Sequence, residues 1–161
     1  MGTLTTTPKL QGDYGELIFE HFCIKNNYAY ITLEAIYNTL TPKNILVFRH
    51  GYERICVKLP EDIVEEVRRI CVPSNGHEEE PSFVYDYFTV SLNNSFKRIK
   101  GGYAQHSFLS RKAFHWIEVK TGKSQLTKNQ KETIKKITLP LRVFRIETIM
   151  PDKINLDWES V

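Results

Sequence analysis

Apolar and polar positions alternate along the chain with both helical and strand periods. In residues 14–26, Tyr14, Ile18 and Phe22 recur at helical spacing, whereas Glu16 and Glu20 fall on another face, which predicts an amphipathic helix. Residues 60–72 open with a proline and early acids that suit the positive end of a second helix. Residues 127–138 predict a third helix. Residues 28–40 fit either a strand or a short helix.

Runs of apolar residues predict the strands of a central sheet. The pattern in residues 44–60 indicates a hairpin that turns around His50 and Gly51. Residues 82–92, 113–120 and 141–149 each favour a strand, and the first two are apolar enough to be buried on both faces. Residues 73–81 predict a polar loop, and residues 151–161 a loose tail. Helices alternating with strands predict one α/β domain over residues 1–161.

Length and composition narrow the class of protein. A chain of 161 residues with 41% hydrophobic and 25% charged residues is typical of one globular domain. The sequence contains no apolar run long enough for a membrane span, and its polar start lacks the apolar core of a signal peptide, so we expect a soluble intracellular protein. Cys23, Cys56 and Cys71 show no CxxC spacing and favour buried reduced thiols over a zinc site or a nucleophile.

Charge is distributed unevenly along the chain. Residues 1–92 hold 8 basic against 13 acidic residues, and residues 93–161 hold 14 against 6, so the two parts carry −5 and +8. This pattern fits a polyanionic partner such as DNA, or only a solvated basic face. The candidate DNA contacts are Lys97, Arg98, Lys100, Arg111, Lys112, Lys123, Lys128 and Lys131. Three interleaved aromatic residues, Phe96, Tyr103 and Phe108, could stack on unpaired bases or simply pack.

Three charged residues stand out because they interrupt the apolar strands. Asp86 has apolar or aromatic neighbours on both sides, and a lone buried carboxylate costs several kcal/mol unless a cation or good donors compensate it. The two-residue period of a strand sends Glu118 and Lys120 to the same face. If the strands are neighbours, the two carboxylates form a site for a hard divalent cation, with the lysine placed to position an attacking water.

A structural role would explain the same residues without any chemistry. Glu118 and Lys120 could form a surface salt bridge worth less than about 1 kcal/mol. Asp86 could instead pair with an arginine of the next strand, such as Arg142 or Arg145.

The ordered combination of these residues resembles a known family of nucleases. Asp86, then IEVKTG with Glu118 and Lys120, then LTKNQ with Gln130 resembles the PD-(D/E)XK nuclease superfamily. It is similar in particular to the archaeal Holliday-junction resolvases and related archaeal viral nucleases. Glu16, directly after a glycine, matches the glutamate that this branch carries on its first helix. Tyr85 stands where the superfamily has its proline. The 70 positions from Glu16 to Asp86 indicate that residues 28–80 are an elaboration of the family's core.

The resemblance implies a fold, a cofactor and a set of roles. It implies a restriction-endonuclease-like core, a central mixed sheet flanked by helices, and a homodimer that cuts DNA with Mg²⁺ or Mn²⁺. Asp86, Glu118 and the carbonyl of Val119 would hold the metal, with Glu16 joining directly or through water. Lys120 would position the attacking water, and Gln130 would orient Lys120 or the scissile phosphate.

Alternative roles remain open at this stage. Gln130 also completes a capping box with Thr127, and Glu16 could serve only as an acid at a helix N-terminus.

From the charged residues and the resemblance together, we expect a structure-selective, Mg²⁺-dependent DNA endonuclease. A catalytically silent nucleic-acid-binding module of the same fold and a metal-free protein-interaction domain are the competing hypotheses.

Overall fold

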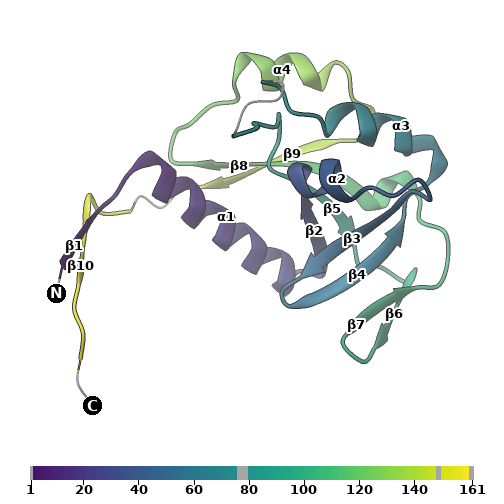
Figure 1. Cartoon of the computed structure of the whole chain (residues 1–161), viewed down its shortest axis with the longest axis horizontal. Helices are drawn as coiled ribbons and strands as arrows, with labels where there is room; N and C mark the ends of the chain where they lie inside the picture. Colours follow the sequence, from purple (N-terminus) through teal and green to yellow (C-terminus); the bar gives the residue numbers. More distant parts are fainter. Residues whose placement is uncertain (1, 76–79, 148–149, 160–161) are drawn as a thin grey trace.

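A six-stranded mixed sheet forms the centre of the protein (Figure 1), seen here in a computed structural model that describes residues 2–75, 80–147 and 150–159. The strand order is β4-β3-β2-β5-β8-β9. Neighbouring strands are antiparallel except β8 and β9, which are parallel. The strands are β2 (Tyr28–Thr32), β3 (Ile45–His50), β4 (Glu53–Lys58), β5 (Tyr87–Ser91), β8 (Phe114–Thr121) and β9 (Leu141–Ile146).

Helices cover both faces of this sheet, as the sequence predicts. The helical segments are α1 (Pro8–Lys25), α2 (Leu33–Thr39), α3 (Glu61–Ile70), α4 (Lys128–Ile134) and a single 3₁₀ turn, η1 (Arg111–Ala113). On one face, Phe19 and Cys23 of α1 pack against Tyr30, Tyr87 and Ile117. On the other face, α2 and α3 contribute to a larger apolar core around Phe88 and Trp116. The mixed α/β class with a central sheet flanked by helices is therefore confirmed.

Helix α1 differs from its prediction in both its start and its buried face. It begins at Pro8, because Thr7 caps it by accepting a hydrogen bond from Leu10 N. The buried positions are Gly15, Phe19 and Cys23, and the predicted apolar residues Tyr14 and Phe22 are about 40% exposed. The predicted face was wrong by one residue because a glycine, which carries no apolar side chain, marks the closest approach of α1 to the sheet.

Most other boundaries shift by a few residues. The ambiguous stretch 28–40 forms both alternatives, strand β2 followed by helix α2. The hairpin turns at Gly51, whose φ of 67° favours glycine. The strand predicted for 82–92 begins only at Tyr87, so Asp86 lies in a bend immediately before β5. Part of the predicted loop 73–81 and the end of the predicted strand 141–149 lie outside the described residues.

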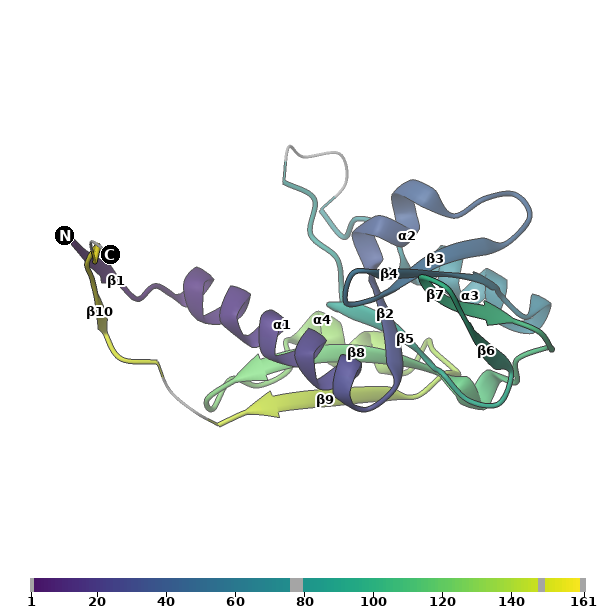
Figure 2. The same cartoon turned by 90° about the horizontal axis from the view of Figure 1, so that it is seen from below.

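Two small sheets were not predicted. The basic connection contains a hairpin of β6 (Phe96–Ile99) and β7 (Gly102–Gln105) beside strand β4. The tail is not loose over its described part, because β10 (Lys153–Leu156) pairs with β1 (Gly2–Thr5). Together they form a two-stranded ribbon that projects away from the sheet at the start of α1 (Figure 2).

The cysteines and the helices test two further expectations. Cys23 and Cys71 are buried thiols, but Cys56 is exposed on the outer face of β4, so the prediction of burial was wrong for that residue. Burial raises the pKa of the Cys23 thiol to about 12, which leaves it protonated and unreactive. Within the described residues, no helix has the length and apolar character needed to cross a membrane.

Candidate active site

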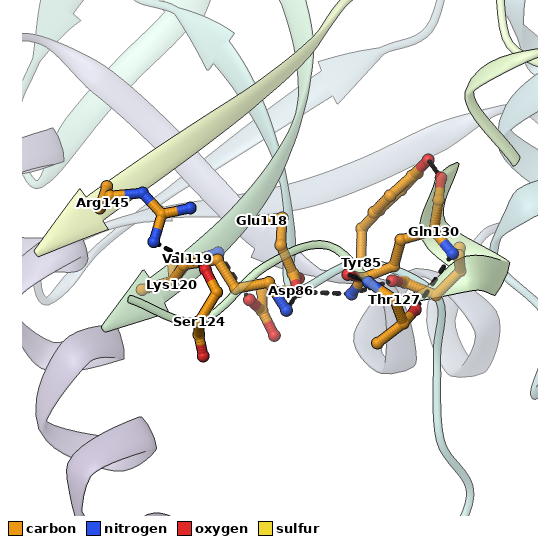
Figure 3. Close-up of polar contacts among 10 residues, drawn as sticks. Tyr85, Asp86, Glu118, Val119, Lys120, Ser124, Thr127, Gln130 and Arg145 are labelled. Carbon is orange, nitrogen blue, oxygen red and sulfur yellow. Dashed lines mark hydrogen bonds and ion pairs between the residues drawn. The ribbon is translucent and has the colours of Figure 1, made fainter. Parts of the chain in front are cut away.

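The predicted convergence of Asp86, Glu118 and Lys120 occurs where β5 begins and β8 ends. The two strands are antiparallel neighbours, with Tyr87 opposite Ile117, so the residue before Tyr87 lies beside Glu118. Figure 3 shows the three side chains gathered at this point. Asp86 Oδ2 accepts a hydrogen bond of 2.7 Å from Val119 N, and Lys120 Nζ lies 3.1 Å from Glu118 Oε2.

Glu118 is a buried carboxyl group beside a second carboxyl group. Only 5% of the surface of Glu118 is exposed to solvent. Burial, followed by a hydrogen bond and charge repulsion from Asp86, raises the pKa of Glu118 to about 8, and the neighbouring Lys120 only partly offsets these effects. Perturbed acids of this kind are typical of functional sites, because an isolated structural carboxylate gains nothing from a second negative charge.

Gln130 holds Glu118 from the opposite side. Its Nε2 donates to Glu118 Oε2 and, over 3.0 Å, to the carbonyl oxygen of Val84. The same side chain closes a capping box with Thr127 at the start of α4, so the local role is confirmed and coexists with the contact to the site. Tyr85 O–H donates to the Gln130 carbonyl oxygen over 2.9 Å and links this unit to the bend that carries Asp86. Gln130 thus contacts Glu118, whereas the sequence predicted a contact with Lys120 or the phosphate.

Glu16 lies close enough to the site to feel the charge of Asp86, because Gly15 lets α1 approach β8 closely. A Cβ atom at Gly15 would lie 2.9 Å from the methyl group of Thr121 and 3.4 Å from Val119. Glu16 lies in the middle of α1, so its interpretation as an acid at a helix N-terminus was wrong. Burial raises the pKa of Glu16 to about 7, with further contributions from the charges of Asp86, Asp13 and Glu20. These carboxyl groups therefore share one electrostatic environment.

Glu20 and Tyr87 extend the site in a way that the sequence did not predict. Tyr87 O–H donates a 2.7 Å hydrogen bond to Glu20 Oε2, and Glu20 in turn contributes to the raised pKa of Glu16. The available signal was spacing, because Glu20 follows Glu16 by one helical turn and lies on the same side of α1. Tyr87 gave no signal, since it reads as an ordinary buried strand residue.

The structural alternatives for the charged residues are only partly realised. Glu118 and Lys120 do form an ion pair, but their side chains are 6% and 13% exposed, so it is not a surface salt bridge. Arg145 donates instead to the carbonyl oxygens of Gly122 and Ser124, and it lies apart from Asp86 (Figure 3). Among the described residues, the ion pairs within 4.0 Å do not include Asp86.

The donor set can hold a divalent cation through two carboxylates. Within residues 2–75, 80–147 and 150–159, no group of three or more His, Cys, Asp or Glu side chains is close enough to hold a metal ion. Asp86 and Glu118 are adjacent, and their repulsion is the kind that a cation relieves. Mg²⁺ commonly uses one or two carboxylates and keeps several waters, so this pair fits Mg²⁺ with Glu16 acting from a greater distance.

The structure separates the predicted DNA contacts into three groups. Lys123, Lys128 and Lys131 are exposed near the site, on the loop after β8 and on α4. The β6–β7 hairpin with Lys97, Arg98 and Lys100 lies at the far end of the sheet (Figures 1 and 2). The last two candidates, Arg111 and Lys112, lie in η1. Arg98 is paired with Glu53, and Arg111 with Asp62.

Of the interleaved aromatic residues, Phe96 is buried and packs within the protein.

Comparisons with known proteins add no assignment to this geometry: no family model, no curated protein and no solved structure matches the chain.

Proposed function

We propose that this protein is a Mg²⁺-dependent DNA endonuclease that hydrolyses phosphodiester bonds. The observation that carries the proposal is the pair of half-buried Asp86 and buried Glu118, with Lys120 at 3.1 Å from Glu118. Two carboxylates and a lysine, gathered where β5 begins and β8 ends, form the minimum set for metal-assisted attack of water on phosphorus. The resemblance of the Asp86, IEVK and LTKNQ segments to the PD-(D/E)XK nucleases supports the same chemistry.

Each residue of the site has a separate task in this proposal. Mg²⁺ or Mn²⁺, held by Asp86 and Glu118, would supply Lewis-acid stabilisation of negative charge on the phosphate. Lys120 donates hydrogen bonds and positive charge toward the attacking water. Glu16, whose pKa is about 7, can accept the proton of that water near neutral pH. Gln130 fixes the orientation of Glu118.

The proposed substrate is branched or otherwise structured DNA. The exposed lysines 123, 128 and 131 place positive charge on the loop after β8 and on α4, and they form no motif that would read base edges in a groove. Contacts of this kind follow the phosphate backbone and respond to the shape of DNA more than to its sequence. Structure-selective cutting, as in Holliday-junction resolution, is the specificity that we propose.

A catalytically silent nucleic-acid-binding module is the competing function. It is favoured by one observation, the absence of a third carboxylate within metal-binding reach among the described residues. The two functions differ in their dependence on Lys120, because a lysine that only binds phosphate contributes one contact among many.

An assay with supercoiled, linear, single-stranded and four-way-junction DNA, with and without Mg²⁺, tests the proposal. We expect Mg²⁺-dependent cleavage that is strongest on the junction. Lys120→Ala should abolish cleavage and reduce DNA affinity by no more than one phosphate contact, whereas Lys153→Ala, at an exposed lysine of the ribbon, should change neither. Binding of DNA by the wild-type protein without cleavage under any of these conditions would establish the silent module.

Calorimetric titration tests the metal separately from DNA. We expect Mg²⁺ or Mn²⁺ to bind the wild-type protein and to raise its thermal stability, because a ligand of the folded state stabilises it. Asp86→Asn should weaken this binding. Equal affinity in the two proteins would remove Asp86 from the metal site.

A homodimer completes the proposed enzyme. One face of the β1–β10 ribbon carries Leu4, Ile154 and Leu156, and Trp158 follows with 91% of its surface exposed. An isolated two-stranded ribbon is marginally stable in water, so this face requires cover. An apolar hollow of about 170 Å³ between α1 and β9 has Arg142 in its lining, which complements the acids on both sides of Trp158.

The apolar face of the ribbon in one copy, with Trp158, therefore matches the apolar hollow in a second copy of the chain. We expect a dimer in sedimentation that Trp158→Ser dissociates and that Lys153→Ala, on the polar face of the ribbon, leaves intact. A monomeric wild-type protein would contradict this arrangement.

A further inference from the structure

The outer face of β3 and β4 carries positive charge that forms no ion pair within the described part of the chain. Helix α1 covers the middle strands on this side and ends near the turn at Gly51, so the face beyond it is open. Arg49 and Arg54 are direct cross-strand partners there. Like charges placed directly opposite one another destabilise an antiparallel pair. Among the described residues, neither arginine lies within 4.0 Å of a carboxylate oxygen.

The β6–β7 hairpin turns this open face into a groove. The hollow has a volume of about 650 Å³, and its floor includes Arg54 and Lys58 while its wall includes Tyr103, His106 and Phe108. None of the residues that line it is acidic. Its electrostatic character therefore favours an anionic ligand.

Three contacts fix the hairpin against β4, so the groove is formed before any ligand binds. Gln105 Oε1 accepts a 2.9 Å hydrogen bond from Lys58 N at the edge of the sheet. Arg98 donates two hydrogen bonds, of 3.0 and 2.9 Å, to Glu53, and its guanidinium lies 4.8 Å from the centre of the Tyr103 ring. The Glu53 carboxylate is thus already engaged by Arg98, and Arg54 on the floor of the groove forms no ion pair among the described residues.

Phe108 identifies the chemistry of the ligand. Phe108 lines the wall of the groove and is 95% exposed to water. This exposure is unfavourable, because burying a phenylalanine side chain lowers the free energy of the protein. Cations beside an exposed aromatic ring are the combination that binds single-stranded nucleic acid, because the cations follow the phosphates and the ring stacks on a base. A base in a duplex has no free face for such stacking.

We propose that the groove between β4 and the β6–β7 hairpin binds an unpaired strand of DNA. This inference deepens the proposed nuclease function and rests on it for the choice of DNA. The groove lies at the end of the sheet away from Asp86 and Glu118 (Figures 1 and 2), so its strand is not the one that is cut. It holds an unpaired part of a structured substrate while a second part occupies the cleavage site.

Fluorescence anisotropy with a labelled oligothymidine of about 12 nucleotides, in EDTA, measures this binding without cleavage. We expect Phe108→Ala to weaken binding between about 5-fold and 150-fold, the loss of one stacked base, and Phe108→Trp to restore it. Arg54→Ala should lower the salt slope by about 0.7, the value for one phosphate contact on a single strand. Lys153→Ala, at an exposed cation of the ribbon, is the matched control.

The outcomes separate this inference from the nuclease function. If wild type and Phe108→Ala bind the oligonucleotide equally, or if a duplex of the same length binds as tightly as the single strand, the groove is not a single-strand site. Cleavage of branched DNA by the wild-type protein would persist in that case. Binding that depends on Phe108 and Arg54 in a protein that never cleaves DNA would support the groove and contradict the nuclease.

Discussion

Glu66 and Glu118 are buried to the same degree, 4% and 5% exposed, yet their surroundings are opposite in kind. Glu66 accepts four hydrogen bonds: 3.0 Å from Trp116 Nε1, 2.6 Å from Thr138 N, 2.7 Å from Thr138 Oγ1 and 3.1 Å from Leu139 N. Burial alone would raise the pKa of Glu66, but these donors outweigh it and hold the pKa below its usual value. Glu118 has Asp86 beside it, and its pKa rises to about 8.

This difference separates a structural carboxylate from the one to which we assign a role in the proposed cleavage. The donors around Glu66 join α3 to β8 and to the segment before β9, so its charge stabilises the fold. The second carboxyl group at Glu118 opposes ionisation, and a fold would be more stable without that conflict. Burial by itself therefore says little about role, whereas the balance of donors against like charges says a great deal.

Replacing Glu118 should have the largest effect, and on activity. We expect Glu118→Gln to lower the rate of Mg²⁺-dependent cleavage by about a thousandfold or more, about 4 kcal/mol in the barrier, because it removes a charged ligand and keeps the shape. Stability without metal should be unchanged or raised by about 1 kcal/mol. Cleavage kinetics and urea unfolding measure the two effects, with Glu132→Gln, an exposed glutamate of α4, as the control. Clear destabilisation with persisting cleavage would make Glu118 structural.

Replacing Glu66 should do the reverse. Glu66→Ala leaves the buried donors of Trp116, Thr138 and Leu139 without an acceptor, which should cost about 3–5 kcal/mol of unfolding free energy. Glu65→Ala, which removes only an exposed pair with Arg69, should cost less than about 1 kcal/mol. Denaturant titration of both variants gives the comparison. A loss at Glu66 no greater than that at Glu65 would show that the four hydrogen bonds do not stabilise the fold.

More of the candidate site than of the long-range contacts elsewhere in the fold could be predicted from the sequence. The two-residue period of a strand brought Glu118 and Lys120 to one face, and the apolar neighbours of Asp86 marked it as buried or close to burial. The role of Glu66 could not be predicted, because its donors follow it by 50 to 73 positions and no local pattern links them. The β1–β10 ribbon joins residues about 150 positions apart and is equally invisible to periodicity.

Glycine in α1 offers a smaller test of how Glu16 reaches the carboxylate pair. Gly15→Ala places a methyl group 2.9 Å from Thr121 Cγ2, so we expect a net loss of about 1 kcal/mol of stability and slower cleavage as Glu16 moves away from Asp86. Gly12→Ala in the same helix meets nothing within 4 Å and should gain about 0.8–1.0 kcal/mol from helix propensity. Thermal unfolding of the two variants measures this contrast. Equal gains in both would mean that α1 is free to shift.

The dependence of stability on pH should also differ between the two glutamates, and with opposite sign. The pKa values of Glu118 and Glu16 rise from 4.5 to about 8 and about 7 on folding. A carboxyl group with a raised pKa stabilises the fold at low pH, and this contribution is lost as the pH rises to the folded value. The lowered pKa of Glu66 adds stability above its unfolded value, which is lost as the pH falls.

Without metal, the free energy of unfolding should therefore decline between about pH 5 and pH 8. Glu118→Gln should make this decline shallower, because an amide cannot ionise, and Glu65→Gln should leave it as in the wild type. Urea unfolding at several pH values in EDTA measures the slopes. Identical slopes for the wild type and Glu118→Gln would mean that Glu118 ionises in the folded protein as readily as in the unfolded chain, and the contrast with Glu66 would then lose its electrostatic basis.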